Sequence, residues 1–243
     1  MRFDSNIDHV HERLKNYRAA QIDRTLSPKE TMNDEWYFPV GEHAIEVIAA
    51  ACISARIRDV KNVLDLPCGH GRVLRHLVHF FPEAKLHACD VDRDGVDFCA
   101  KTFAAHPIHS REDLTKVDSG TLFAVVWVGS LFTHTSREVT RAWLTHLSRS
   151  LTDEGIIIST FHGRWSRYVA ELSPFIDDTS WNDIIVQYNT TGYGYRDYPT
   201  GHSHDYIQGS YGVSLAKPHT IVQEIEKIPG VRIHLYRERG WGD

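Results

Sequence analysis

The most restrictive feature of this sequence is an apolar strand that ends in an acid and turns through two glycines into a helix. The expected strand covers residues 61–66 and holds Asp65 near its end, and Gly69 and Gly71 form the turn. Glycines at such a turn let the backbone approach a ligand closely at the carboxyl edge of a sheet. A second strand ends in Asp90, 19 residues beyond Gly71, where a carboxylate can accept both hydroxyls of a ribose. Together these features predict a site for a nucleoside-containing cofactor.

Short apolar stretches alternate with helical periods through the middle of the chain. Strands are expected over residues 61–66, 85–90, 107–109, 122–129 and 155–161, with helices between them. The run 122–129 lacks polar alternation, as expected of a strand buried on both faces. Thr135 and Glu138 have the spacing of a capping box for the helix that follows. We therefore expect an α/β fold with a doubly wound, Rossmann-like parallel sheet in the order 3-2-1-4-5.

The flanking segments differ from this core. We divide the chain, as one domain overall, into an N-terminal helical segment (1–58), a cofactor-binding core (59–161), an aromatic-rich and glycine-rich cap (162–217) and a C-terminal part (218–243). Outside the core, helices are expected over residues 7–22, 42–57 and 218–228, and strands near 183–190, 210–215 and 231–237. The position of the cap, after the fifth strand, would place it over the carboxyl edge of the sheet, where an acceptor would bind.

Composition limits the possible partners and location. The net charge of −5 argues against a nucleic-acid-binding surface. The four cysteines form no CxxC pair and are expected to be reduced thiols of a cytoplasmic protein. Residues 1–15 lack the apolar core of a signal peptide, and the apolar stretch 122–128 is too short to span a bilayer. We expect no membrane partner.

The glycine turn matches neither of two common nucleotide fingerprints. Leu74 stands where the dinucleotide pattern GxGxxG has its third glycine, and no GK[ST] follows, which excludes a P-loop. The stretch 63–72 instead resembles motif I of class I S-adenosylmethionine (SAM)-dependent methyltransferases, which reads [D/E]-x-G-x-G-x-G. Pro67 stands at the first glycine of that motif.

Four further stretches, in the family's order, carry the resemblance. Residues 88–92 resemble the ribose-binding motif, 110–114 the adenine-contacting segment, 123–134 the fourth strand with its turn, and 151–158 the turn into strand five. The resemblance implies the class I fold and SAM as cofactor. It implies cofactor contacts at Asp65, Pro67, Gly69 and Gly71 in the turn, Asp90 and Asp92 at the ribose, Asp113 and Leu114 beside adenine, and Gly129 and Ser130 below the methionine end.

The acceptor site is less determined by the sequence. The candidate general bases are His134, His162 and Asp197. His134 follows the fourth strand, but among 16 histidines the interpretation as a histidine that hydrogen-bonds the backbone is favoured for it. Tyr193, Tyr195 and Asp197 either line an acceptor pocket or belong to a packed hairpin. The aromatic cap favours a small molecule or a sugar, methylated on oxygen or nitrogen. The segment 202–205 contains two histidines and an aspartate but has no matching further ligands, so we expect no metal site.

Three alternatives stay open at this point. They are an NAD-dependent oxidoreductase on a similar sheet, a non-catalytic SAM-binding or interaction protein that keeps the fold, and an RNA methyltransferase. Binding of S-adenosylhomocysteine (SAH) against NAD tests the first, turnover on an acceptor panel the second, and salt-dependent RNA binding the third.

Overall fold

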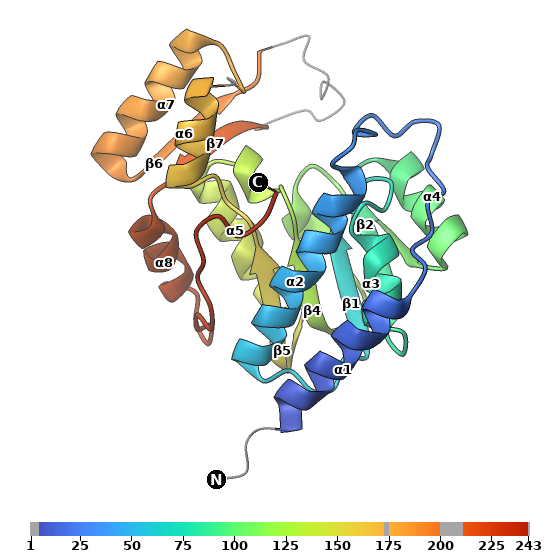
Figure 1. Ribbon diagram of the computed structural model, residues 1–243. Coiled ribbons are helices and arrows are strands. Elements are labelled where there is room, and N and C mark those ends of the chain that lie inside the picture. Colours follow the sequence, from blue (N-terminus) through green and yellow to red (C-terminus); the bar gives the residue numbers. More distant parts are fainter. Residues whose placement is uncertain (1–4, 173–174, 200–210, 243) are drawn as a thin grey trace.

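A five-stranded parallel sheet lies at the centre of the molecule, with strands in the order β3-β2-β1-β4-β5. This computed structural model describes residues 5–172, 175–199 and 211–242 (Figure 1). The strands are β1 (Asn62–Leu66), β2 (Lys85–Asp90), β3 (His106–His109), β4 (Phe123–Val128) and β5 (Leu151–Ser159). The predicted strand order is confirmed, and every residue of β4 is buried, as its unbroken apolar run indicates.

Helices cover both faces of the sheet (Figure 1). The helices α1 (Ser5–Ala19), α2 (Tyr37–Ala55), α3 (Leu74–Phe80) and α4 (Arg93–Phe103) pack on one face, and α5 (Arg137–Ser148) and α8 (Pro218–Glu226) on the other. Successive side chains of a strand point to opposite faces, so Val63 joins the first core and Leu64 the second. Compared with the sequence expectation, α1 ends three residues earlier and α2 begins five residues earlier.

The helix α2 is also the one helix, within the described part of the chain, that is long and apolar enough to cross a membrane. Eight of its residues are buried inside the protein. Buried core helices pass the same length and hydropathy test, so this is weak evidence for a membrane span.

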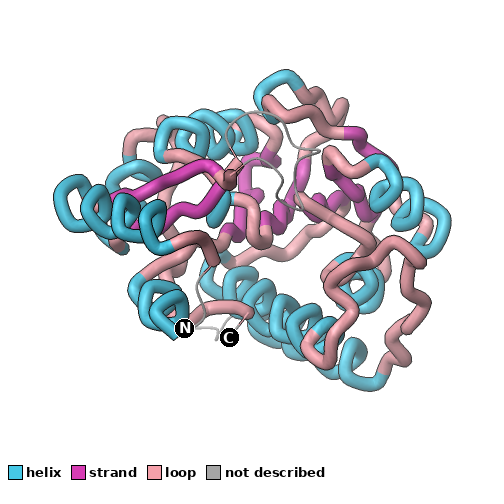
Figure 2. The backbone as a smooth tube through the Cα atoms, turned by 90° about the horizontal axis from the view of Figure 1, so that it is seen from above, coloured by secondary structure: helices cyan, strands magenta, loops and turns pink. Residues whose placement is uncertain are grey.

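The cap consists of two helices and a hairpin beside the core sheet (Figures 1 and 2). Its elements are α6 (Arg164–Leu172), α7 (Asp178–Thr191), β6 (Tyr193–Asp197) and β7 (Gly212–Ala216). The predicted strand over 183–190 is wrong, because this stretch lies within α7. The Asp177 carboxylate caps the start of the helix, and Gly192, at φ +82°, ends it.

The predicted final strand over residues 231–237 is also wrong. These residues form no strand, and no described segment pairs with the outer edge of β5. Side chains hold the C-terminal segment instead. The Ser54 hydroxyl donates a hydrogen bond to the His234 carbonyl at 2.6 Å, and the Trp241 indole N–H donates to the Val40 carbonyl at 2.9 Å.

The start of α5 differs from the predicted capping box by one residue. Ser136 is the N-cap, and its hydroxyl accepts from the Val139 amide at 3.4 Å. Thr135 is fully buried, and its hydroxyl shares a hydrogen bond with that of Thr140 at 2.7 Å. Burial of Thr135 therefore moves the capping role to the next hydroxyl in the chain.

Candidate active site

The glycine turn after β1 is held against the end of β2. The Cys68 amide donates to the Cys89 carbonyl at 3.0 Å, and the Gly69 amide donates to Asp90 Oδ2 at 2.8 Å. The other carboxylate oxygen, Asp90 Oδ1, accepts from the Asp92 amide at 3.0 Å. Each carboxylate oxygen has further lone pairs. Asp90 can therefore fix the turn and still accept hydrogen bonds from a ligand.

Glycine is required at the two positions of the turn for different structural reasons. At Gly69, φ is +46°, and apart from its chain neighbours no atom of the described residues lies within 4 Å of the position that a Cβ would take, so the turn borders open space. At Gly71, φ is +81° and a Cβ would lie 2.5 Å from the Phe103 ring, so this glycine lets α4 pack closely. Gly95 in α4, which the sequence pattern did not single out, has the same purpose, because a Cβ there would collide with the Gly69 carbonyl.

Asp65 is the least satisfied polar group near the turn. Its side chain is only 1% exposed, and neither carboxylate oxygen has a hydrogen-bond partner among the described residues. Burial, and after it the charge of Asp90, raises the pKa of the Asp65 carboxyl well above its ordinary value, and the nearby Leu74 amide lowers it by a smaller amount. An unpaired buried carboxylate beside an open turn is a suitable partner for a ligand that carries positive charge or hydrogen-bond donors.

The N-terminal segment 20–36 folds against the same turn through Arg75. The Arg75 guanidinium is buried and donates to the carbonyls of Asp23 at 2.8 Å, Thr25 at 3.1 Å and Gly71 at 2.9 Å. Sequence analysis missed this residue, because an arginine within an apolar helix gives no signal of the distant carbonyls that it contacts.

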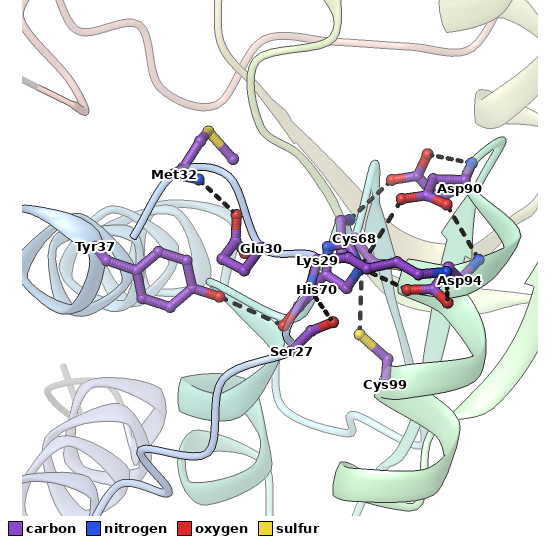
Figure 3. Close-up of polar contacts among 12 residues, drawn as sticks. Ser27, Lys29, Glu30, Met32, Tyr37, Cys68, His70, Asp90, Asp94 and Cys99 are labelled. Carbon is purple, nitrogen blue, oxygen red and sulfur yellow. Dashed lines mark hydrogen bonds and ion pairs between the residues drawn. The ribbon is translucent and has the colours of Figure 1, made fainter. Parts of the chain in front are cut away.

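Polar side chains extend this contact toward α4 (Figure 3). Lys29 reaches across the turn to Asp94 at 2.6 Å, and His70 Nε2 lies 3.1 Å from the other oxygen of Asp94. The Tyr37 hydroxyl donates to the His70 carbonyl at 3.4 Å. The N-terminal segment is thus part of the wall around the candidate cofactor site.

The remaining acids predicted to bind the cofactor also have local partners. Asp92 caps α4 by accepting from the Asp94 amide at 3.1 Å. Asp113 accepts from the Thr115 amide and hydroxyl, and these hydrogen bonds lower the pKa of its carboxyl. Leu114 is buried in the core beneath it. Contact between these residues and a cofactor stays a prediction.

The turn after β4 is tied to the end of β5. Gly129 is buried, and a Cβ there would lie 2.6 Å from the Trp127 indole nitrogen. Ser130 is exposed at φ +55°, and its amide donates to the Thr160 hydroxyl at 2.8 Å. These residues lie at the carboxyl edge of the sheet, as predicted from the motif, beside the cap.

His134 lies where the cap meets this edge. Its Nδ1 is 2.8 Å from the Gly212 carbonyl of β7 and 3.3 Å from the Tyr198 hydroxyl, and its ring stacks on Tyr211 with centroids 4.7 Å apart. Asp197 lies opposite Gly212 in the hairpin. The structure therefore places His134 and Asp197 on the two sides of strand β7's first residue, where the cap meets the core.

Tyr193 holds the cap hairpin against the core. Its buried hydroxyl donates to the Thr135 carbonyl at 2.9 Å, which joins the hairpin to the start of α5. Tyr195 differs, because its hydroxyl donates to the Asp197 carboxylate at 2.7 Å near the exposed end of β6. Of the three cap residues that sequence analysis singled out, Tyr195 and Asp197 form a pair and Tyr193 belongs to the packed hairpin.

The prediction that no metal site is present concerns residues 202–205, which lie outside the described residues. Within the described part, no group of three or more potential ligands could hold a metal ion. The four cysteines are buried free thiols.

Comparison with known proteins places this site in a methyltransferase domain. Residues 64–157 match a family model described as a methyltransferase domain, and no curated protein matches significantly. A SAM-dependent methyltransferase from Clostridium acetobutylicum ATCC 824 has a similar solved structure, with 13% identity, coverage of 91% of this chain and 85% of that chain, and a TM-score of 0.50.

Two further similar structures are DesVI from Streptomyces venezuelae and the sugar N-methyltransferase KedS8 from Streptoalloteichus sp ATCC 53650. Identity is 18% and 20%, the matches cover 50% and 57% of this chain, and the TM-scores are 0.41 and 0.40. The chain spans 52% and 57% of the length of these two proteins. At these identities the likeness concerns the fold.

Proposed function

Because this chain belongs to the class I SAM-dependent methyltransferases through residues 64–157, we propose that it transfers the methyl group of SAM to a small-molecule or sugar acceptor, on oxygen or nitrogen. The observation that carries the proposal is Asp65, a buried carboxylate whose oxygens have no hydrogen-bond partner in the described part of the chain, beside the open side of the glycine turn. A cofactor with a cationic methionine part and two ribose hydroxyls would supply what Asp65 and Asp90 can accept.

In this proposal the cofactor lies along the carboxyl edge of the core. Its contacts would be Asp65, Pro67, Gly69, Gly71, Asp90, Asp92, Asp113, Leu114, Gly129 and Ser130. When bound, SAM supplies an activated methyl group. The chain must then place a nucleophile in line with the S–CH3 bond and exclude water, and such positioning can lower the barrier by roughly 7–11 kcal/mol.

We assign the acceptor to the space between the turn 129–134 and the cap, within one domain whose core is 59–161 and whose cap is 162–217. Tyr195 and Asp197 would offer an aromatic face, a hydroxyl and a carboxylate to a polar acceptor. His134 stays the candidate base from the sequence. The net charge of −5 supports a small acceptor rather than a nucleic acid, and we propose a cytoplasmic location.

Calorimetric titration of the purified protein with SAH and, separately, with NAD tests the cofactor. We expect SAH to bind and NAD not to bind. Asp90→Ala should lower SAH affinity about tenfold to more than a hundredfold, because it removes charge-assisted hydrogen bonds of roughly 1.5–3 kcal/mol. Asp97→Ala is the matched control. Asp97 lies on α4 and forms an exposed ion pair with His109 of β3, so this variant should bind SAH like the wild type.

The alternatives give distinct results in the same experiments. Binding of NAD without SAH would contradict the proposal in favour of an oxidoreductase. Binding of SAH without turnover on a panel of sugars, amino sugars and phenols would indicate a non-catalytic SAM-binding protein. RNA binding that weakens steeply with salt would indicate an RNA methyltransferase.

A further inference from the structure

Two histidines from neighbouring strand ends use the same strand of the cap in the same way. His134 follows β4, and its Nδ1 lies 2.8 Å from the Gly212 carbonyl. His162 follows β5, and its Nδ1 lies 3.1 Å from the Ser214 carbonyl. Because a carbonyl can only accept, Nδ1 carries the proton in each ring whenever that ring is neutral, and Nε2 is then the basic nitrogen. The hairpin therefore fixes the tautomer of each ring.

The geometry of β7 explains why both contacts are possible. The Tyr211 carbonyl accepts from the Tyr198 amide across the hairpin, so the alternate carbonyls of Gly212 and Ser214 point away from β6. His162 is fixed a second time through its backbone, since its carbonyl accepts from the Ala216 amide at 2.9 Å.

Stacking restricts the orientation of the His162 ring as well. The ring lies parallel to that of Phe175, with centroids 5.3 Å apart and an interplanar angle of 5°. The His134 ring lies 6.2 Å away at 73°. A ring that is held at Nδ1 and on one face, beside the carboxyl ends of β4 and β5, has the arrangement of an oriented base rather than that of a mobile surface histidine.

Resting on the proposed function, we propose that His162 is the catalytic base of this site and that the acceptor is a hydroxyl compound whose proton passes to His162 Nε2. In that step the acceptor oxygen forms a bond to the methyl carbon, and the electrons of the S–CH3 bond remain on sulfur, which gives neutral SAH. The O–H proton moves to Nε2 and forms an imidazolium ion. Ser214 orients the ring by accepting from Nδ1–H, and the charge is balanced because the sulfonium charge ends on the imidazole.

Burial determines the protonation state of the free ring. Burial lowers the pKa of His162 to about 4, so the ring is neutral near pH 7 and its basic nitrogen is unprotonated before the acceptor arrives. Among the described residues, the titratable groups near the ring include His134 and, farther out in the cap, the hydroxyls of Tyr198 and Tyr211. Burial also raises the pKa of Tyr198, which keeps that hydroxyl neutral.

The decisive variant is His162→Asn. The asparagine amide can donate to the Ser214 carbonyl as Nδ1 does, but it has no basic nitrogen at the position of Nε2. We expect the turnover number with a hydroxyl acceptor from the panel to fall at least about a hundredfold, with SAH affinity and acceptor KM within threefold of the wild type. His146→Gln is the matched control, because His146 also hydrogen-bonds a carbonyl, that of Val117, but lies on α5 away from the cap.

A second measurement keeps the test independent of the acceptor. Long-range proton–nitrogen NMR spectra of histidine-labelled wild type, assigned by the signal lost in His162→Asn, should show His162 neutral and protonated at Nδ1 at pH 7. An Nε2–H tautomer or a charged ring would overturn the proposal even if SAH binds. A turnover loss in His134→Asn that exceeds the loss in His162→Asn would also overturn it. If the wild type binds no SAH, the proposed function itself fails, and the NMR result then decides the state of His162 alone.

Discussion

At the scale of single residues, we expect Asp65 to lower the stability of the ligand-free fold and to strengthen cofactor binding. Its carboxyl pKa is raised by burial, so the folded chain holds the proton more tightly than the unfolded chain does. At neutral pH, burial of Asp65 therefore lowers the free energy of unfolding. This loss of stability disappears as the pH falls toward the ordinary carboxyl pKa. We expect Asp65→Asn to stabilise the ligand-free protein at pH 7 by about 1–3 kcal/mol, or several degrees in Tm, and to weaken SAH binding at least about tenfold.

Thermal unfolding at pH 7 and pH 5 together with calorimetry measures both effects. The gain in Tm should be smaller at pH 5, because wild-type Asp65 is then closer to protonation. The exposed control Asp97→Asn should change neither Tm nor SAH affinity. A lower Tm with unchanged SAH binding would show that Asp65 is a structural residue with no part in the site.

At the scale of elements, the N-terminal segment depends on one buried guanidinium. Arg75 donates to carbonyls of that segment and of the glycine turn, and Arg75→Met removes these side-chain hydrogen bonds, although the Gly71 carbonyl keeps the Arg75 amide as a partner. Hydrogen bonds from a charged group contribute roughly 1.5–3 kcal/mol each, so we expect a loss of at least about 2 kcal/mol in the free energy of unfolding. Urea denaturation measures the loss, and limited proteolysis should show faster cleavage within residues 20–36.

The matched control for this prediction is Lys29→Ala. Lys29 also joins the N-terminal segment to the site, but its ion pair with Asp94 is exposed, with Lys29 at 69% and Asp94 at 40% side-chain exposure. Exposed ion pairs contribute about 0–1 kcal/mol, so this variant should unfold nearly like the wild type. Equal losses in the two variants would contradict the central role of Arg75.

Elements that repeat a local pattern could be predicted from the sequence, and elements that depend on a partner could not. The core strands were predicted because parallel strands buried on both faces are apolar without interruption. Residues 183–190 contain β-branched and aromatic residues typical of a strand, but the Asp177 cap and burial of Ile184 make them a helix. Residues 231–237 alternate like a strand, yet no described segment supplies hydrogen bonds to them.

The same distinction applies to the candidate site. Asp65, Gly69 and Asp90 could be predicted because a strand, a turn and the next strand place them within one short stretch of chain. Arg75 and Gly95 could not, since their importance comes from the approach of the N-terminal segment and of α4 to the turn. The acceptor side was predicted only as a region, because it depends on how the cap hairpin meets the strand ends.

At the scale of the whole molecule, the cap is a small body with its own core. Ile184 and Tyr188 of α7 pack with Val213 and Leu215 of β7, apart from the two cores of the sheet. The Ser214 hydroxyl donates to the Phe132 carbonyl and joins this body to the end of β4. The residues between the cap and the core are therefore positioned by two separately packed units, and in the proposed function changes within the cap should affect the acceptor more than the cofactor.

Stability of the whole molecule should fall in mild acid because of buried neutral histidines. Burial lowers the pKa of His76, His87 and His162 to about 4, while the same residues in an unfolded chain have a pKa of about 6.5. Above pH 6.5 these histidines are neutral in both states and do not lower the free energy of unfolding. As the pH falls from 6.5 toward 4, the unfolded chain binds more protons than the folded chain, and the free energy of unfolding decreases. At pH 5.5 each fully buried histidine of this kind costs about 1 kcal/mol relative to neutral pH.

A variant of His76 separates the histidine effect on the free energy of unfolding from that of the buried carboxyls. Carboxyls with raised pKa values stabilise the folded chain as the pH falls, which is the opposite direction. It is 2% exposed, its Nδ1 shares a hydrogen bond with the Tyr17 hydroxyl at 2.8 Å, and its Nε2 has no partner among the described residues. We expect the loss in free energy of unfolding between pH 7 and pH 5.5, measured by urea denaturation, to be about 1 kcal/mol smaller in His76→Gln than in the wild type. His9→Gln, an exposed change on α1, should leave the loss unchanged. Since all carboxyls are common to the three proteins, an identical loss in His76→Gln would mean that His76 is not held neutral by the fold.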